Sequence, residues 1–301
     1  MTLSKHRLFS TLTLALLICG AVFIAYAADK QKPGALRLLQ DLPYTPQGRN
    51  HNQILDLLLP TSASKEHKVP LIVWIHGGAW CRGDKKETPA QFFAPAGYAI
   101  ASIDYRLTDE ARFPAQVEDC KAAIRWLRAH ADEYNFDSNR IGIFGGSAGG
   151  HLVAMLGLTG DDKEFDDTGS HRDLSSKVQA VCDWCGPADL TTFVKQAGKH
   201  YCLDREMQKF LGGKLEDNRE LALKASPISY VTPNAPPFLI MHGDADEMVP
   251  YAQSEQLVEA LKKAHDDVQF ITIKGGGHAF GSAETITQVL DFFDAKLKMQ
   301  R

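Results

Sequence analysis

The stretch GGSAGG at residues 145–150 constrains this chain more than any other. It follows the apolar run Ile141-Gly142-Ile143-Phe144 and precedes the apolar run that begins at His151, so the order predicted is strand, tight turn, helix. A turn of this kind holds Ser147 in a strained backbone conformation with its hydroxyl exposed, and it needs neighbours with almost no side chain. Glycine-rich turns between strands and helices are common. The motif therefore indicates a nucleophile only if a base, an acid and oxyanion donors occur elsewhere in the right order.

Strands alternate with helices along the rest of the chain. Apolar runs predict strands at 53–59, 69–75, 98–103, 178–184, 236–241 and 268–273, in addition to the run before Ser147. Helices are predicted after Pro114 and at 251–265 and 285–297, whereas 28–50 is expected to be an extended entry segment and 137–140 a turn. Residues 186–225 lack a clean period and are expected to form short helices and loops over the sheet edge, as a partial lid. The alternation predicts the α/β class, with a mostly parallel sheet and helices on both faces.

The first thirty residues have a different composition. Lys5, His6 and Arg7 precede an uncharged apolar stretch over 8–24, and Ala25-Tyr26-Ala27 supplies the small residues that a signal peptidase reads. We expect residues 1–27 to be a signal peptide and 28–301 a single domain, exported to the periplasm or secreted. A transmembrane anchor is the alternative, because the apolar stretch is close to the lower limit for a span.

Five cysteines remain after removal of the signal peptide, and this odd number leaves at least one thiol free or paired between chains. Cys182 and Cys185 form a single C-x-x-C without further ligands at zinc-site spacing. On one strand they would point to opposite faces, so they are not expected to bond to each other. A disulfide between Cys185 and Cys202 is predicted instead, tying the segment 186–225 to the sheet edge.

A serine hydroxyl needs a base to remove its proton during attack on a carbonyl. Among ten histidines of the mature chain, His278 follows three glycines at the end of the last predicted strand. Ligand-facing loops of open α/β sheets gather at such ends. Glycines allow this loop to fold inward, so His278 is predicted to be the base. His76 is interpreted as a structural residue, and His151 as one that satisfies a backbone carbonyl or a neighbour.

The base in turn needs a carboxylate that fixes its tautomer and stabilises the imidazolium. The stretch HGDADEMVP at 242–250 follows a predicted strand and offers Asp244 and Asp246, with Glu247 as a third candidate. Asp244 directly follows a glycine and is typical of a turn. Asp246 lies further along and can reach the loop of His278, so Asp246 is preferred. The order Ser147, Asp246, His278 is that of the α/β-hydrolases.

The oxyanion that forms during acyl transfer needs N–H donors placed in advance. The N–H of Ala148 directly follows the nucleophile. The loop HGGAW at 76–80 offers Gly78 and Ala79, with Gly77 as an alternative, because residues without bulk allow close approach of the backbone.

Several motifs together resemble the carboxylesterases related to hormone-sensitive lipase, and in particular the branch with bacterial acetyl-xylan and feruloyl esterases. They are HGGAW, DYR, FPA, GGSAGGH, HGDADxxVP and GGGHAF, and they run from about Gln53 to the C-terminus. The resemblance implies an α/β-hydrolase fold with Ser147, Asp246 and His278 as the triad and the 77–79 loop with Ala148 as the oxyanion hole. Ala79 stands where many relatives have glycine, and Cys81, Cys185 and Cys202 belong to none of these motifs.

The sequence thus predicts an exported serine esterase for short-chain acyl esters, with acetyl or feruloyl groups on plant polysaccharide as candidate substrates. No metal or other cofactor is implied, and no stable membrane insertion is expected after cleavage. A formal net charge of −4 gives no indication of a nucleic-acid surface. The alternatives are a peptidase of the prolyl-oligopeptidase type, although the chain has no room for that family's propeller domain, and a non-catalytic binding protein on the same fold.

Overall fold

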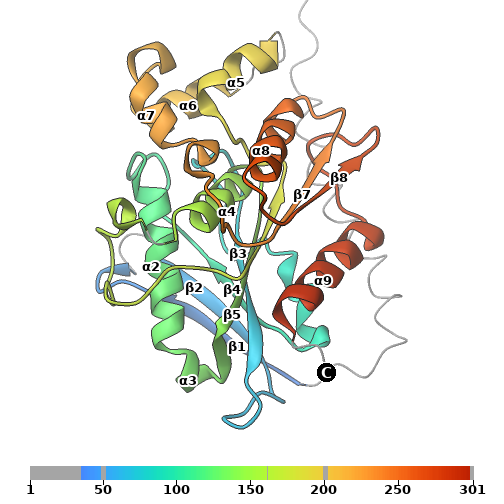
Figure 1. Ribbon diagram of the computed structural model, residues 1–301. Coiled ribbons are helices and arrows are strands. Elements are labelled where there is room, and N and C mark those ends of the chain that lie inside the picture. The colour runs from blue at the N-terminus through green and yellow to red at the C-terminus, as the bar shows by residue number, and fades with distance from the viewer. Residues whose placement is uncertain (1–34, 49–51, 161, 199–202, 299–301) are drawn as a thin grey trace, which may run out of the picture.

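Eight strands form one sheet in the computed structural model, which describes residues 35–48, 52–160, 162–198 and 203–298. The strand order is β1-β2-β4-β3-β5-β6-β7-β8 (Figure 1). The strands are β1 Leu36–Pro43, β2 Ile54–Pro60, β3 Val69–Ile75, β4 Ala99–Ile103, β5 Phe136–Gly146, β6 Ala180–Trp184, β7 Phe238–Gly243 and β8 Val268–Ile273. β2 is antiparallel to both of its neighbours, and every other pair is parallel. The predicted mostly parallel sheet is confirmed.

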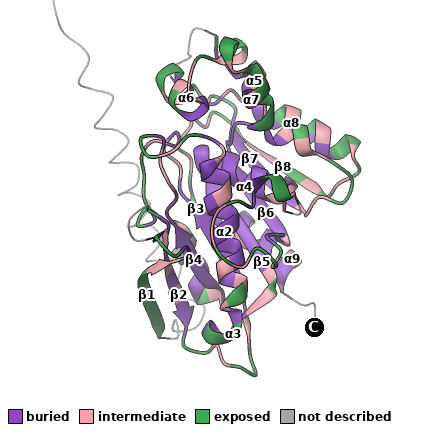
Figure 2. Cartoon of the chain, turned by 90° about the vertical axis from the view of Figure 1, so that its left-hand side faces the viewer, coloured by how far each residue is buried: buried purple, intermediate pink, exposed green. Residues whose placement is uncertain are grey.

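Helices cover both faces of this sheet. The main ones are α2 Ala115–Ala129, α4 Ala148–Leu158, α8 Ala252–Lys263 and α9 Ala283–Leu297, with the short α3 Ala131–Tyr134 and the 3-10 helix η3 Ala90–Ala96. Alternate residues of β3 enter different cores: Val73 packs in the cluster of α2, α4 and α8, and Trp74 in that of η3 and α9. A strand that is covered on both faces must be apolar at every position, which explains why β3 appears in the sequence as a continuous apolar run. Figure 2 shows this buried centre.

Two predicted segments differ from the structure, one at the edge of the sheet and one in its centre. The entry segment contains β1, whose Leu36 and Leu38 are exposed, so the strand is held by its backbone pairing with β2 and has little apolar signal. Residues 137–140 are not a turn but the beginning of β5, because Phe136 lies opposite Val69 in the parallel ladder.

The segment between β6 and β7 forms short helices, as predicted. These are α5 Leu190–Ala197, α6 Asp204–Leu211 and α7 Arg219–Lys224, with 3-10 turns η6 Leu215–Asp217 and η7 Pro227–Tyr230. Figures 1 and 2 both place α5, α6 and α7 beyond the C-terminal ends of β6 and β7. α6 buries Met207, Phe210 and Leu211 against the rest of the protein. The segment therefore covers the end of the sheet at which the loops with chemically useful residues emerge.

The predicted signal peptide lies outside the described residues. Within the described part of the chain, we found no helix with the length and apolar character that crossing a bilayer requires.

Candidate active site

Ser147 lies at the junction of β5 and α4 with φ 57° and ψ −121°, a left-handed conformation that side-chain-bearing residues rarely adopt. Its N–H donates to the carbonyl of Trp184 on the neighbouring strand at 2.8 Å. Gly149 lets α4 pass close to β3, because a Cβ there would stand 2.1 Å from the carbonyl oxygen of Ile75. The strand, sharp turn and helix predicted around this serine are therefore present.

Three side chains from three separate loops meet at this turn. His278, in the loop after β8, has its Nε2 3.0 Å from Ser147 Oγ. Its Nδ1 lies 2.7 Å from Oδ2 of Asp246, in the loop after β7. The strands β5, β7 and β8 are parallel, so their C-terminal ends lie at the same end of the sheet. Loops that are distant in sequence therefore converge there. The structure thus brings together the three residues that the sequence analysis singled out.

The side chain of Asp246 is fully buried, and both of its oxygens accept hydrogen bonds. Oδ1 accepts hydrogen bonds from the N–H groups of Met248 at 2.7 Å and Val249 at 2.9 Å. Oδ2 faces His278 and, at 3.2 Å, Nε2 of His242. Burial raises the pKa of this carboxyl, but the hydrogen bonds from the two histidines outweigh it and hold the pKa well below its usual range. Asp246 is therefore an anion fixed in one orientation.

The anion decides which nitrogen of His278 carries the proton. Nδ1–H donates to Asp246, so Nε2 presents its lone pair to the hydroxyl of Ser147. Burial lowers the pKa of His278, but the contacts with Cys185 and Asp246 outweigh it and raise the pKa above its ordinary value. The arrangement can accept a proton from Ser147 and stabilise the imidazolium that results.

Asp244 has a different place. Its Oδ1 accepts from the N–H of Gly275 at 2.6 Å, which ties the loop after β7 to the loop after β8. Asp246, and not Asp244, is thus the carboxylate against His278, and Asp244 has the turn-forming role that its position after a glycine indicates.

The predicted disulfide between Cys185 and Cys202 is wrong, because Cys185 is a free thiol; Cys202 itself lies outside the described residues. Cys185 directly follows β6 with φ 46°, and its Sγ is buried 3.8 Å from Nδ1 and 3.7 Å from the carbonyl oxygen of His278. The thiol therefore packs under the histidine. Burial raises the pKa of this thiol. Cys182 is also free, as expected for a residue that cannot reach Cys185.

Cys185, Asp246 and His278 have donor atoms within 4.8 Å of one another, the one such group found in the described ranges. The set contains the sulfur, nitrogen and oxygen ligands of zinc. However, the 2.7 Å hydrogen bond between Asp246 and His278 leaves no space for an ion between those two atoms. As arranged, the group serves His278 and is not a metal centre.

The loop after β3 lies against Ser147. A Cβ on Gly77 would stand 2.7 Å from the carbonyl oxygen of Gly146 and 3.5 Å from Cβ of Ser147. The next residues Gly78, Ala79 and Trp80 all have positive φ, at 109°, 51° and 58°. Among the described residues, no acceptor is recorded for the N–H groups of Gly78, Ala79 and Ala148. These N–H groups are therefore available to a ligand beside Ser147.

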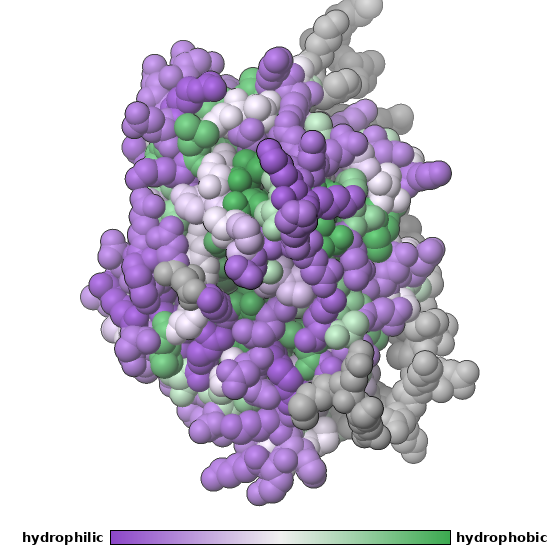
Figure 3. Space-filling model, in the orientation of Figure 1, coloured by the Kyte–Doolittle hydropathy of each residue, from purple (hydrophilic) through white to green (hydrophobic). Residues whose placement is uncertain are grey.

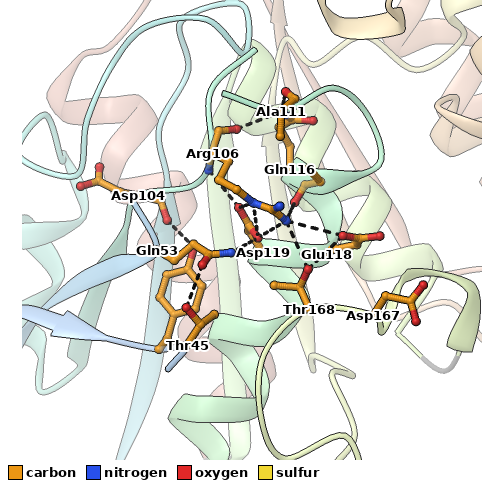
Figure 4. A network of polar contacts seen from close by, with 12 residues as sticks. Thr45, Gln53, Asp104, Arg106, Ala111, Gln116, Glu118, Asp119, Asp167 and Thr168 are labelled. Carbon is orange, nitrogen blue, oxygen red and sulfur yellow. Dashed lines mark hydrogen bonds and ion pairs between the residues drawn. The ribbon is translucent and has the colours of Figure 1, made fainter. Parts of the chain in front are cut away.

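Buried side chains support this loop from behind. Tyr105 donates its hydroxyl to the carbonyl of His76 at 3.0 Å, and the two rings stack with centroids 4.3 Å apart. The neighbouring Arg106 donates two hydrogen bonds to the buried carboxylate of Asp119, from Nε at 2.9 Å and from Nη2 at 2.7 Å (Figure 4). Gln53 donates to the same carboxylate at 2.6 Å. The DYR motif thus anchors the loop after β4, and that loop supports the one beside Ser147.

Three supporting residues had weaker signals in the sequence. His242 bridges Ser254, Asp246 and the carbonyl of Val249, and its position at the end of β7, four residues before Asp246, was its only indication. His151 contacts a backbone carbonyl, as interpreted, and also Trp80. Trp80 is 1% exposed and belongs to the core. Trp184 and Phe280 lie together with ring centroids 5.0 Å apart.

A parallel sheet with a serine at a strand-to-helix turn and His and Asp from later loops defines the α/β-hydrolase class. The model of the BD-FAE family matches residues 55–261. The chain belongs to this family, the bifunctional acetyl-xylan and feruloyl esterase family.

Individual relatives agree with this assignment. The chain is 33% identical over 251 residues to Esterase LipQ of Mycobacterium tuberculosis (strain ATCC 25618 / H37Rv), a match that covers 82% of this chain and 58% of that protein. The matches to Esterase LipC and to the probable carboxylic ester hydrolase LipM of that organism cover 53% and 59% of those proteins, so the chain spans little more than half of the length of these curated relatives.

Solved structures show the same fold. A truncated carbohydrate esterase from gut microbiota superposes with a TM-score of 0.80 at 29% identity, covering 90% of this chain and 99% of that one. A bifunctional GH43-CE protein of Bacteroides eggerthii has a TM-score of 0.79 at 32% identity, covering 86% of this chain and 38% of that one.

Proposed function

We propose that this chain is a serine carboxylesterase that works through an acyl-enzyme. Ser147 is the nucleophile, His278 the general base and Asp246 the residue that orients and stabilises the protonated histidine. The observation that carries the proposal is the continuous line of hydrogen bonds from Ser147 Oγ through His278 to Asp246, at 3.0 and 2.7 Å. A hydroxyl polarised in this way attacks carbonyl carbon.

The reaction proceeds in two halves. Ser147 attacks the ester carbonyl as His278 takes its proton, and the resulting oxyanion is stabilised by the N–H groups of Gly78, Ala79 and Ala148. His278 then protonates the leaving alcohol, and an acyl group remains on Ser147. Water attacks this acyl-enzyme with His278 again as base, which releases the acid. Each oxyanion donor contributes roughly 2.7–4 kcal/mol to the barrier reduction.

The proposed substrates are short-chain esters, from acetate to butyrate, and acetyl or feruloyl groups on polysaccharide. The segment over the site supports this, because α6 is rich in charge, with Asp204, Arg205 and Glu206 in its first turn, and α5 carries Lys195. Figure 3 shows hydrophilic residues over most of the face it depicts, with apolar residues in small separate areas. A docking surface for an oil interface would need one large apolar patch. The two carbohydrate-esterase structures agree with a sugar-linked ester.

The test is kcat/KM across p-nitrophenyl esters of increasing chain length, with acetylated and feruloylated xylan and a peptide p-nitroanilide alongside, and Ser147→Ala as the blank. We expect a maximum at acetate to butyrate. A maximum at long acyl chains would contradict the short-ester proposal. Faster cleavage of the anilide would favour the peptidase, and equal absence of turnover in wild type and blank would favour a binding protein.

We further propose that the protein is exported after removal of residues 1–27. The basic start, the apolar stretch and the Ala25-Tyr26-Ala27 site support this. Protein purified from its native host should begin at Ala28 or within a residue or two of it. An intact mass that includes the first 27 residues would contradict the proposal.

A further inference from the structure

The oxyanion loop, defined here as residues 76–82, has a backbone that needs outside support. Ala79 and Trp80 both have positive φ, which side-chain-bearing residues tolerate only when surrounding contacts hold them. Trp80 makes several of those contacts. Its ring stacks on Phe210 of α6 at 4.2 Å, and its carbonyl accepts from the N–H of Thr108 at 2.9 Å.

The remaining polar contact of Trp80 is a hydrogen bond from its indole Nε1 to Nδ1 of His151, at 3.2 Å. An indole nitrogen can only donate, so Nδ1 of His151 must be the acceptor. The other ring nitrogen, Nε2, then carries the proton and donates to the carbonyl of Ala225 at 2.7 Å. His151 is completely buried, and burial lowers its pKa to about 4, so the ring is neutral near neutral pH. Its two contacts require this one tautomer.

His151 therefore joins three parts of the protein. It lies in the first turn of α4, and its own N–H donates to the carbonyl of Ser147 at 2.9 Å. Trp80 belongs to the oxyanion loop, and Ala225 is the residue that ends α7 of the segment over the site. The side-chain contacts with Trp80 and Ala225 join His151 to residues at least 71 positions away in the sequence.

We propose that His151 is a positioning residue for catalysis: by holding Trp80 from the nucleophile helix, it keeps the N–H groups of Gly78 and Ala79 directed at the oxyanion. This inference rests on the proposed function. The inference adds to that function a role for the side chain of His151, which contacts neither the substrate nor a triad side chain but helps to set the geometry of the oxyanion hole. Through its contact with Ala225, His151 also links this geometry to α7.

The experiment compares kcat of His151→Leu with kcat of His151→Gln. Each value is divided by the fraction of protein whose Ser147 reacts with an organophosphate, so that only correctly folded sites are counted. Leucine fills the space without polar atoms, so kcat per titrated site should fall about tenfold to hundredfold with little change in KM. Glutamine offers an acceptor for Trp80 and a donor for Ala225, so its kcat should stay within about threefold of wild type. The inhibition constant of a trifluoromethyl ketone, which forms an oxyanion on Ser147, should rise in step with the loss of kcat/KM.

A double-mutant cycle with Trp80→Phe isolates the hydrogen bond, because phenylalanine keeps an aromatic ring but lacks the indole N–H. We expect the double variant Trp80→Phe/His151→Leu to have about the kcat of the poorer single variant. Thr159→Val is the control: Thr159 is buried at the far end of α4, and its hydroxyl donates to the carbonyl of Met155 at 2.6 Å. This change should lower Tm and leave kcat per titrated site unaltered.

Unchanged kcat per titrated site in His151→Leu, a glutamine variant as slow as the leucine variant, or additive effects in the cycle would each overturn the inference alone. A wild-type protein that neither hydrolyses esters nor reacts with the organophosphate would overturn the proposed function and this inference with it.

Discussion

The loop that carries Asp246 and the oxyanion loop lie on either side of Ser147 and are held by different means. Asp246 is fixed by groups close to it in sequence: its oxygens contact His242, Met248 and Val249, and only His278 comes from elsewhere. The oxyanion loop depends on distant groups, namely His151 on α4, Tyr105 after β4 and Phe210 on α6.

This difference has a physical origin. A carboxylate needs donors, and the N–H groups of the next few residues supply them at no cost in long-range packing. The oxyanion loop has a local turn, in which the N–H groups of Cys81 and Arg82 donate to the carbonyl of Gly78 at 3.1 Å. Positive φ at Ala79 and Trp80 is unfavourable for residues with side chains, so tertiary contacts must also hold the loop. Changes near Asp246 should therefore act on the chemistry directly. Changes around the oxyanion loop should act through packing and affect stability and rate together.

The largest expected effect sets the reference for both loops. Ser147→Ala removes the nucleophile that they serve, so kcat should fall about 10⁶-fold on p-nitrophenyl acetate. The side chain is small and half-exposed, so the fold should be unaltered by circular dichroism. Undiminished turnover in this variant would remove the mechanism altogether.

The acid loop is tested by Asp246→Asn, which should lower kcat about 10⁴-fold because His278 loses the partner that fixes its tautomer and charge. Asp244→Asn is the matched control two residues away. Asp244 only accepts from the N–H of Gly275, so its loss should change kcat by less than about tenfold and weaken the contact between the two loops. If Asp244→Asn were the inactive variant, the assignment of the acid would be reversed.

The pH dependence reports on the same loop. His278 acts as a base only when neutral, and its pKa is raised. We therefore expect kcat/KM to increase with pH, with a midpoint above pH 6.5, and to decrease about tenfold for each pH unit below that midpoint. In Asp246→Asn the anion that favours the imidazolium is gone, and the midpoint of the residual activity should move to lower pH. The measurement is kcat/KM against pH for both proteins; a midpoint that does not move would show that Asp246 does not set it.

The smallest effect separates packing from chemistry at the oxyanion loop. Tyr105→Phe removes the hydrogen bond to the carbonyl of His76, so the free energy of unfolding should fall by about 1 kcal/mol and kcat a few-fold. Tyr44→Phe removes a similar buried bond, 2.7 Å from its hydroxyl to the carbonyl of Asp104, without touching that loop. It should cost similar stability, measured by denaturant titration, and leave kcat as it is. Equal kcat losses in both variants would show that the oxyanion loop has no special dependence on Tyr105.

The elements that the sequence predicted well are those with strong local patterns. The run at 69–75 forms β3 with these bounds, because a strand covered by helices on both sides is apolar throughout. The run at 268–273 forms β8 with these bounds, although this edge strand is only partly buried and includes Gln269 and Thr272. Ser147, Asp246 and His278 could be singled out because each follows a predicted strand in a glycine-containing loop. By contrast, β1 exposes most of its side chains and gave no such pattern, since its partner is backbone.

The sequence was thus sufficient to predict seven of the eight strands, the turn around Ser147 and the order of the three residues that meet there, because periodicity and glycine spacing are local properties. The tertiary structure was needed to show that the Cys185 thiol packs against His278 and is not bonded to Cys202. It also decided that Trp80 is a buried anchor and that His151 connects it to α7. These contacts join residues that are close in space and far apart in the chain, and the packing of the whole domain determines them.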